Sequence, residues 1–181
     1  MYRIMLLIVL ATLAMSLAWA TEESQKMEYK HREDKLGDLI MVGIEMVDNM
    51  EQEAYMKLWE KFFEIDEKIP NAMDDAYYGI SFATQNAEGK EAWGYMVAAA
   101  VKGLEEIPQE MAVRKIPARK YVVFEHRGSV EKIAGLYEFI YGKYAHSGEH
   151  KLLFAESLER YDHRYKAGSE DSIMEIWVPV E

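Results

Sequence analysis

The stretch RKYVVFEHRGSVEKIAGLYEFIYGKY, residues 119–144, changes its apolar period halfway along. Residues 119–127 are rich in Tyr, Val and Phe, as a β-strand is, and Gly128 ends the run. Ser129 is a good helix N-cap residue. After it, apolar residues recur every three or four positions, which is one face of a helix: Ile133, Leu136, Tyr137, Ile140 and Tyr141. We therefore predict a strand followed directly by a helix.

The order strand–helix–strand–strand then occurs twice along the chain. Apart from residues 119–144, the strands are expected at 36–47, 76–84, 92–102, 155–165 and 172–180, and the first helix at 50–68. This order predicts an α+β fold made of two repeats, residues 36–102 and 116–181. We expect an antiparallel six-stranded sheet with two helices on one face and an open groove on the other. Residues 103–115 join the repeats in an extended conformation.

The N-terminus has the features of a secretory signal. Arg3 is followed by an apolar run from Ile4 to Leu17 and by the small-x-small sequence Ala18-Trp19-Ala20. The run is shorter than the roughly 20 residues of a transmembrane helix. We predict that residues 1–20 are a cleaved signal peptide, that residues 21–35 are a flexible polar leader and that residues 36–181 form one domain. The expected location is the periplasm or the exterior, with no membrane anchor after cleavage; an uncleaved anchor is the alternative.

Composition and motifs exclude several classes of function. The net charge of the 181 residues is -11, and removal of residues 1–20 takes away only Arg3 among the charged residues. Nucleic-acid binders need a basic footprint, so no nucleic-acid partner is expected. There is no Cys, no phosphate-binding loop and no nucleophile elbow, and Ser147-Gly148 argue against a metal pair of His146 and His150. We therefore expect no cofactor and no metal ion.

The last strand, SIMEIWVPV, contains a carboxylate that calls for an explanation. Alternate side chains of a strand share a face, so Glu175 and Trp177 point away from Met174, Ile176 and Val178. The aliphatic set suits the core under a helix, and an acid beside an indole suits the open face. There Glu175 would attract a cation. The alternative is a structural ion pair with Arg160 or Arg119 on a neighbouring strand.

Aromatic side chains provide the other candidate ligand-binding residues. The chain has 12 Tyr and 4 Trp, which combine a large apolar surface with a polar group. The candidates beside Glu175 are Trp177, Tyr121, Tyr161, Phe82 and Trp93. Such rings around a carboxylate would hold a flat or cationic organic molecule by stacking and cation–π contact. Each ring taken singly is as consistent with the core as with a binding site.

Five motifs in the second half resemble the GyrI-like small-molecule-binding domain, which also serves as the effector-binding part of AraC- and MerR-type regulators. In order they are EEIPQEM at 105–111, KIPARKYVVFEHRGSVEKI at 115–133, LYEFIYGKYAHSG at 136–148, ERYDHRY at 159–165 and MEIWVPV at 174–180. The resemblance implies a duplicated fold and places Glu175 at the floor of a ligand groove. Residues 36–100 carry no equally sharp motif.

Three functions are compatible with these features. The first is an exported module that binds a small hydrophobic or cationic organic ligand in an aromatic groove, with Glu175 as the counter-charge. The second is a hydrolase of small electrophilic compounds, with Glu175 as general base and Tyr121 or Tyr161 as proton donor. The third is a partner-binding protein whose groove holds another chain. The edge strands of the sheet would also allow a homodimer.

Overall fold

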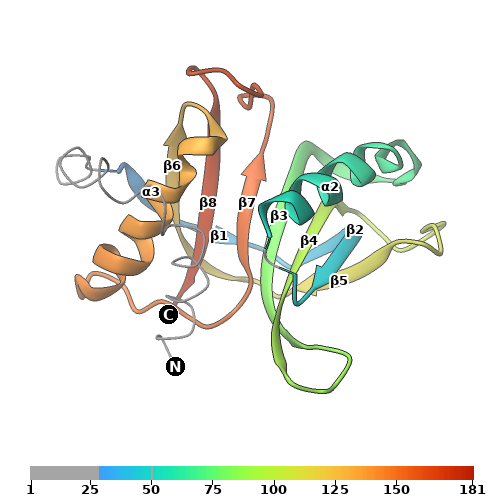
Figure 1. Cartoon of the computed structure of the whole chain (residues 1–181), viewed down its shortest axis with the longest axis horizontal. Coiled ribbons are helices and arrows are strands. Elements are labelled where there is room, and N and C mark those ends of the chain that lie inside the picture. The colour runs from blue at the N-terminus through green and yellow to red at the C-terminus, as the bar shows by residue number, and fades with distance from the viewer. Residues whose placement is uncertain (1–28, 50) are drawn as a thin grey trace.

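The computed structural model describes residues 29–49 and 51–181, which contain one mixed α+β unit (Figure 1). In this part of the chain, eight antiparallel strands form one sheet in the order β1-β6-β8-β7-β3-β4-β2-β5. Their bounds are β1 His31–Leu36, β2 Leu39–Val47, β3 Ala72–Gln85, β4 Glu91–Val101, β5 Ala112–Ile116, β6 Arg119–Arg127, β7 Ser157–Tyr161 and β8 Ile173–Val180. The predicted α+β class with an antiparallel sheet is confirmed.

The number of strands differs from the prediction, because two short edge strands extend the six expected ones. Residues 31–35 of β1 lie in the segment that we expected to be a polar leader, and β1 pairs with β6 from His31 to Leu36. The prediction of a leader that reaches residue 35 is therefore wrong for residues 31–35. β5 lies in the segment that joins the repeats and pairs with β2. Residues 1–28, including the predicted signal peptide, lie outside the described residues.

The two repeats meet at the middle of the sheet. In the first repeat β3, β4 and β2 are neighbours, and in the second β7, β8 and β6 occupy the matching positions. β3 and β7 pair with each other, which joins the repeats into one sheet. At this junction Gly79 lies opposite Glu159, and Ser81 lies opposite Ser157.

Both helices cover the same face of the sheet. The first, α2 (Gln52–Phe63), packs Phe62 against a cluster with Val97 and Ala99 of β4. The second begins where the sequence predicts, since the Ser129 side chain accepts a hydrogen bond from the backbone of Glu131. It runs through a short 3-10 turn into α3 (Ile133–Glu138) and continues as a π-helix.

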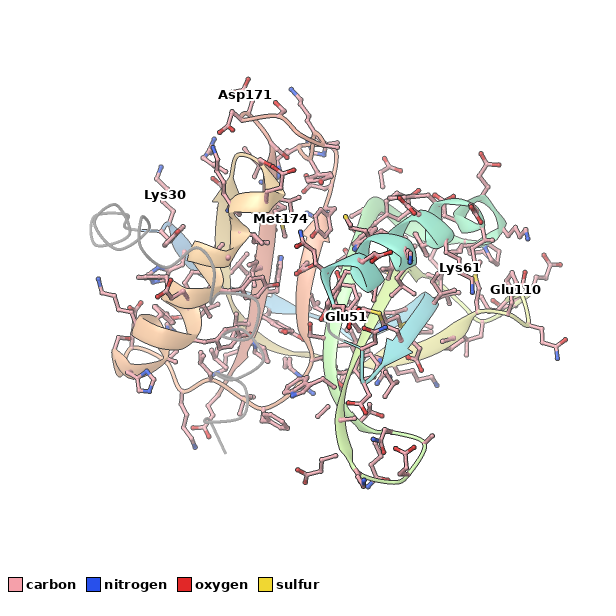
Figure 2. The ribbon with its side chains drawn as sticks, in the orientation of Figure 1. Lys30, Glu51, Lys61, Glu110, Asp171 and Met174 are labelled. Atoms are coloured by element: carbon pink, nitrogen blue, oxygen red, sulfur yellow. The ribbon has the colours of Figure 1, made fainter. Side chains whose placement is uncertain are left out.

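The π-helical turn spans Phe139–Lys143, and a 3-10 turn at Tyr144–His146 ends the second helical segment. Leu136 and Ile140 of this segment pack against Met174, Ile176 and Val178 of β8, with Met174 in the layer beneath α3 (Figure 2). The predicted orientation of these three aliphatic residues is therefore confirmed. Charged side chains such as Lys30, Lys61 and Asp171 project from the outside of the ribbon.

Most of the face without helices is a packed core, and a cleft opens beside it. The sheet bends strongly, because β5 and β6 lie near opposite ends of the strand order yet only two residues separate them. Side chains of both halves therefore meet on this face, among them Met41, Met96, Tyr121 and Trp177. No helix of the described residues is long and apolar enough to span a membrane.

Candidate functional site

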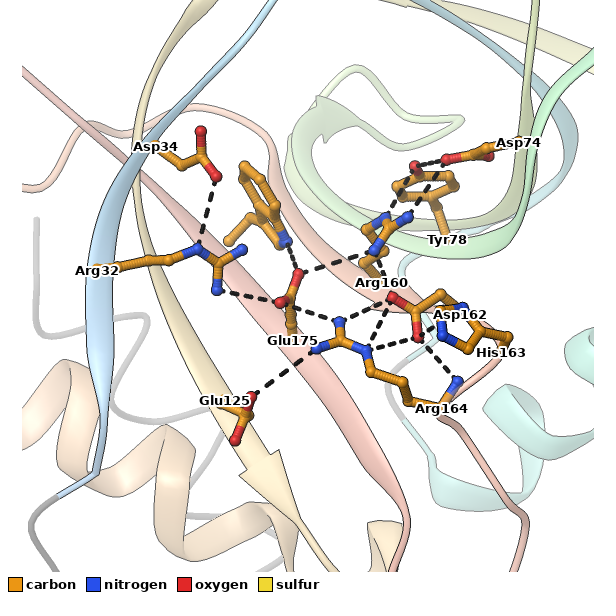
Figure 3. A network of polar contacts seen from close by, with 11 residues as sticks. Arg32, Asp34, Asp74, Tyr78, Glu125, Arg160, Asp162, His163, Arg164 and Glu175 are labelled. Atoms are coloured by element: carbon orange, nitrogen blue, oxygen red, sulfur yellow. Dashed lines mark hydrogen bonds and ion pairs between the residues drawn. The ribbon is translucent and has the colours of Figure 1, made fainter.

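Glu175 lies at the centre of an arginine network at one end of the face without helices (Figure 3). Its side chain is only 3% exposed. One carboxylate oxygen lies 3.0 Å from a guanidinium nitrogen of Arg32 and 3.0 Å from one of Arg164. The other accepts a hydrogen bond of 3.0 Å from the Trp177 indole, and Arg160 lies 3.9 Å away. The structural ion pair that the sequence left open is thus present, with Arg160 as one partner.

Further acids extend the network around these arginines. Asp162 bonds both Arg160 and Arg164, at 2.5 and 2.7 Å. Burial alone would raise the pKa of Asp162, but hydrogen bonds from the side chain and backbone of Arg164 lower it to about 2. Burial would likewise raise the pKa of Glu175, and the hydrogen bonds from Arg32 and Arg164 hold it below its ordinary value. Both carboxyl groups are therefore ionised and already matched by cations.

A cleft of about 750 Å³ opens beside this network, lined by Arg32, Tyr78, Arg160, Arg164 and Glu175 among others. The carboxylate in this cleft, Glu175, has a lowered pKa, whereas a general base that acts near neutral pH needs a raised one. Neither Tyr121 nor Tyr161 is hydrogen-bonded to Glu175 in this structure. The Tyr121 hydroxyl is buried without a hydrogen-bond partner, and Tyr161 lies on the other face of the sheet. The geometry therefore gives the hydrolase interpretation no acid–base pair at Glu175.

A second carboxylate, Glu159 of β7, lies on the opposite face between the two helices. It accepts hydrogen bonds from three tyrosine hydroxyls: Tyr95 at 2.7 Å, Tyr161 at 3.0 Å and Tyr137, which makes the shortest of the three. These residues come from β4, the end of β7 and α3, so both repeats contribute. Glu159 is half-buried, and its carboxylate lies among these three hydroxyls.

Glu159 differs from Glu175 in its charged partners. Among residues 29–49 and 51–181, no Lys, Arg or His makes an ion pair with Glu159, whereas three arginines surround Glu175. Burial raises the pKa of Tyr95, Tyr137 and Tyr161 well above 10, and the nearby Glu159 raises it further. The three hydroxyls therefore stay protonated, and they donate to Glu159 without neutralising its charge.

A glycine makes room for this cluster. A Cβ atom on Gly79 of β3 would collide with the Tyr95 hydroxyl and with the Glu159 carboxylate. Only a residue without a side chain lets these two groups meet directly above the strand. Gly79 is therefore part of what positions the hydrogen bond between Tyr95 and Glu159.

More rings surround the three tyrosines. Tyr141, on the π-helical turn, stacks on Tyr137 with an interplanar angle of 5° and a centroid distance of 6.2 Å. Trp59 of α2 meets Tyr161 edge to face at 5.0 Å and donates a hydrogen bond to the Tyr95 hydroxyl. Glu159 with Trp59, Tyr95, Tyr137, Tyr141 and Tyr161 is called the tyrosine cluster below. The cluster combines the negative charge of Glu159, which no cation of the described residues pairs with, and several aromatic rings. This combination is suited to bind an organic cation.

The predicted site residues do not form a single group. Trp177 touches Glu175, but Tyr121, Phe82 and Trp177 belong to the packed core of the face without helices. The Arg114 guanidinium lies 3.3 Å from the centroid of the Phe82 ring and covers that ring. Of the six candidates, only Tyr161 belongs to the tyrosine cluster. Trp93 points to the helix-covered face, like Tyr95 two residues later, and pairs with Phe154.

Glu159 itself was missed, although the sequence contains a signal for it. Glu159 and Tyr161 are two residues apart on a predicted strand, so they share a face. The same alternation that singled out Glu175 beside Trp177 applies to this pair. The partners of Glu159 gave no such signal, because Tyr95 is 64 residues away in the sequence and Tyr137 is 22 away.

The duplicated sheet, with a carboxylate contacted by three tyrosines between its helices, is typical of a small-molecule-binding domain. The model of the GyrI-like small molecule binding domain matches residues 29–181, and the chain belongs to this family. The transcriptional regulator BrlR of Pseudomonas aeruginosa is 25% identical over 142 residues, which is 77% of this chain and 51% of BrlR. The chain thus spans about half the length of the curated relative that it matches.

Solved structures with the same fold include a putative bacterial transcription regulation protein from Staphylococcus aureus MU50. It is 25% identical with a TM-score of 0.63, over 86% of this chain and 99% of that one. SAV2435, bound to tetraphenylphosphonium, is 24% identical with a TM-score of 0.66, over 86% and 94% of the chains. The C-terminal domain of EcmrR is 18% identical with a TM-score of 0.65, over 86% and 99%. At these identities, SAV2435 and EcmrR show the shared fold alone.

Proposed function

We propose that this domain binds hydrophobic aromatic cations at the tyrosine cluster, with the Glu159 carboxylate as the counter-charge. The observation that carries the proposal is the contrast between the two carboxylates. In the part of the chain that the structure describes, three arginines surround Glu175, while the half-buried Glu159 is bonded by neutral tyrosine hydroxyls and by no cation. A partly desolvated carboxylate with no cation of its own favours a ligand that brings one.

The aromatic rings add shape selectivity to this charge. A cation over the face or near the edge of Tyr and Trp rings gains roughly 0.5–2 kcal/mol from each cation–π contact. Apolar substituents of the ligand would replace water on the rings of Trp59, Tyr137 and Tyr161. Tetraphenylphosphonium, the ligand of the similarly folded SAV2435, is a cation shielded by four phenyl groups and has this combination of properties. It is therefore the probe of choice for this chain.

Replacement of Glu159 by Gln should weaken the binding of tetraphenylphosphonium without unfolding the protein. Gln keeps the size of the side chain and can still accept from the tyrosines, but it removes the charge. We expect the Kd to rise at least about tenfold, which corresponds to about 1.4 kcal/mol. Isothermal titration calorimetry of both proteins measures this difference.

Two controls separate charge from hydrophobic adsorption. Tetraphenylborate has the same four phenyl groups with a negative charge, so wild type should bind it far more weakly than tetraphenylphosphonium. Glu138→Gln removes an equal charge from an exposed position next to Tyr137 and should bind like wild type. Equal affinity for both ions, or equal losses in Glu138→Gln and Glu159→Gln, would refute the proposal.

We further propose that the domain acts outside the cytoplasm. The support is the sequence of residues 1–20, with Arg3, an apolar run and Ala18-Trp19-Ala20. Expression in a bacterial host, followed by fractionation and intact mass spectrometry, tests this proposal. The expected product is an exported chain that begins at Thr21. A cytoplasmic chain that retains residues 1–20 would contradict it.

A further inference from the structure

An exposed aromatic pair lies outside the tyrosine cluster. Phe154 precedes β7 and is 66% exposed. Among the described residues, no other large hydrophobic side chain is as exposed. It meets the ring of Trp93, at the start of β4, with a centroid distance of 5.4 Å and an interplanar angle of 72°. Contiguous exposed apolar surface is a common feature of ligand and partner contacts, so the position of this pair relative to the tyrosine cluster matters.

The strand register connects this pair to the tyrosine cluster. On β3, Gly79 lies opposite Glu159, Ser81 lies opposite Tyr95, and Ala83 lies opposite Trp93. Gly79, Ser81 and Ala83 are alternate residues of β3, so all three lie on the face of the sheet that carries Glu159. Four residues of a strand span about 13 Å. Trp93 is therefore about 13 Å along the strand from the Glu159 position.

No large side chain of β3 projects into the path between the two positions. Gly79 has no side chain, and Ser81 and Ala83 have small ones. Ser81 is half-buried and Ala83 is exposed, so this part of the face is accessible. On β7, the residue beside Ser81 is Ser157, which is also small and half-buried.

Rings border this path on the side of the second helix. Tyr141 lies near Ser157 and stacks on Tyr137, which donates a hydrogen bond to Glu159. Aromatic surface thus runs from Glu159 along Tyr137 and Tyr141 toward Ser157, and Phe154 lies three residues before Ser157 in the chain. The negative charge lies at one end of this surface and the apolar pair Trp93 and Phe154 at the other.

We propose that Trp93 and Phe154 form an apolar subsite for the distal arm of an elongated, amphiphilic cation whose charged centre lies at Glu159. This inference rests on the function proposed above, and it adds the length and polarity of the ligand. Trp93 also lies two strands away from Glu159, so the subsite selects ligands whose apolar arm extends about 16 Å from the cationic centre. Compact cations reach only the tyrosine cluster.

A series of alkyltriphenylphosphonium ions tests this subsite, because only the length of one arm changes. The purified chain is titrated calorimetrically with the methyl, butyl, heptyl and decyl compounds. We expect the Kd of wild type to fall roughly tenfold or more from butyl to decyl, since each methylene that is partly buried strengthens binding about twofold. Phe154→Ala and Trp93→Ala should abolish most of this gain and leave the Kd of the methyl compound unchanged.

A control variant excludes unspecific adsorption of the longer chains. Leu104 is an exposed apolar residue between β4 and β5, and Leu104→Ala should show the same gain with chain length as wild type. If the methyl compound binds through Glu159 but the gain is equal in all variants, the subsite is refuted and the proposed function stands. If the methyl compound does not bind, or binds equally well to Glu159→Gln, the proposed function is refuted and the subsite with it.

Discussion

Glu175→Gln should lower the free energy of unfolding by about 3 kcal/mol, the lower end of the range for loss of one partner of a buried ion pair. Glu175 is 3% exposed and holds Arg32 and Arg164, each at 3.0 Å. Without its charge, two guanidinium groups lose a partner, and the link from β1 to β8 is weakened. Arg32 and Arg164 remain partly in contact with solvent, which limits the cost. Urea denaturation of wild type and variant measures the difference.

Glu156→Gln is the matched control. Glu156 is 22% exposed and pairs with Arg119 at 3.7 Å, so its loss should cost less than about 1 kcal/mol. A loss in Glu175→Gln no larger than in this control would mean that the arginine network does not stabilise the fold.

The pH dependence of the same pair of proteins gives an independent check. Burial alone would raise the pKa of Glu175, but hydrogen bonds from Arg32 and Arg164 lower it below 4.5 in the folded state. A group with a lowered folded pKa stabilises the protein above its unfolded pKa and loses this effect as the pH falls through the folded value. The difference in stability between wild type and Glu175→Gln should therefore shrink below pH 4.5. If the difference in stability stays constant with pH, it arises from packing and not from the charge of Glu175.

Gly79→Ala should disrupt the tyrosine cluster although it changes neither a charge nor a ring. The new methyl group would occupy the space of the Tyr95 hydroxyl and the Glu159 carboxylate. We expect the Kd for tetraphenylphosphonium to rise at least about tenfold. The free energy of unfolding should fall by about 1–3 kcal/mol, as for other overpacked sites.

Gly37→Ala is the control for this substitution, because a Cβ atom there meets nothing within 4 Å. It should leave both affinity and stability close to wild type. Calorimetric titration measures the Kd, and urea denaturation the free energy of unfolding, of wild type, Gly79→Ala and Gly37→Ala. Unchanged affinity in Gly79→Ala would mean that the contact between Tyr95 and Glu159 is not needed for binding.

Local sequence patterns predicted the parts of the fold that depend on neighbours in the chain. The alternation of residues 173–178 placed Met174, Ile176 and Val178 under α3, and the Ser129 cap marked where that helical segment begins. β1 was missed because HREDKL is as polar as a disordered leader. It forms a strand by pairing with β6, more than 80 residues away, which no local pattern reveals.

The candidate site depends on contacts between residues distant in the sequence even more than the fold does. The sequence identified a carboxylate beside an aromatic residue on a strand, and both Glu175 and Glu159 fit that description. Their difference lies in the distant residues that reach them. Arg32 comes to Glu175 from the N-terminal edge strand, and Tyr95 comes to Glu159 from the other repeat. The spacing of residues within one strand predicts neither of these contacts. The sequence alone therefore could not show which carboxylate is available to a ligand.

The most direct test of Glu159 as the counter-charge is to locate the cation in crystals of the protein. Tetraphenylarsonium has the shape and charge of tetraphenylphosphonium, and its arsenic atom gives an anomalous signal in X-ray diffraction. We predict one main arsenic peak beside the Glu159 carboxylate, within about 6 Å of the rings of the tyrosine cluster. A main peak in the cleft beside Glu175, or no peak near Glu159 in crystals that bind the ion, would contradict this assignment.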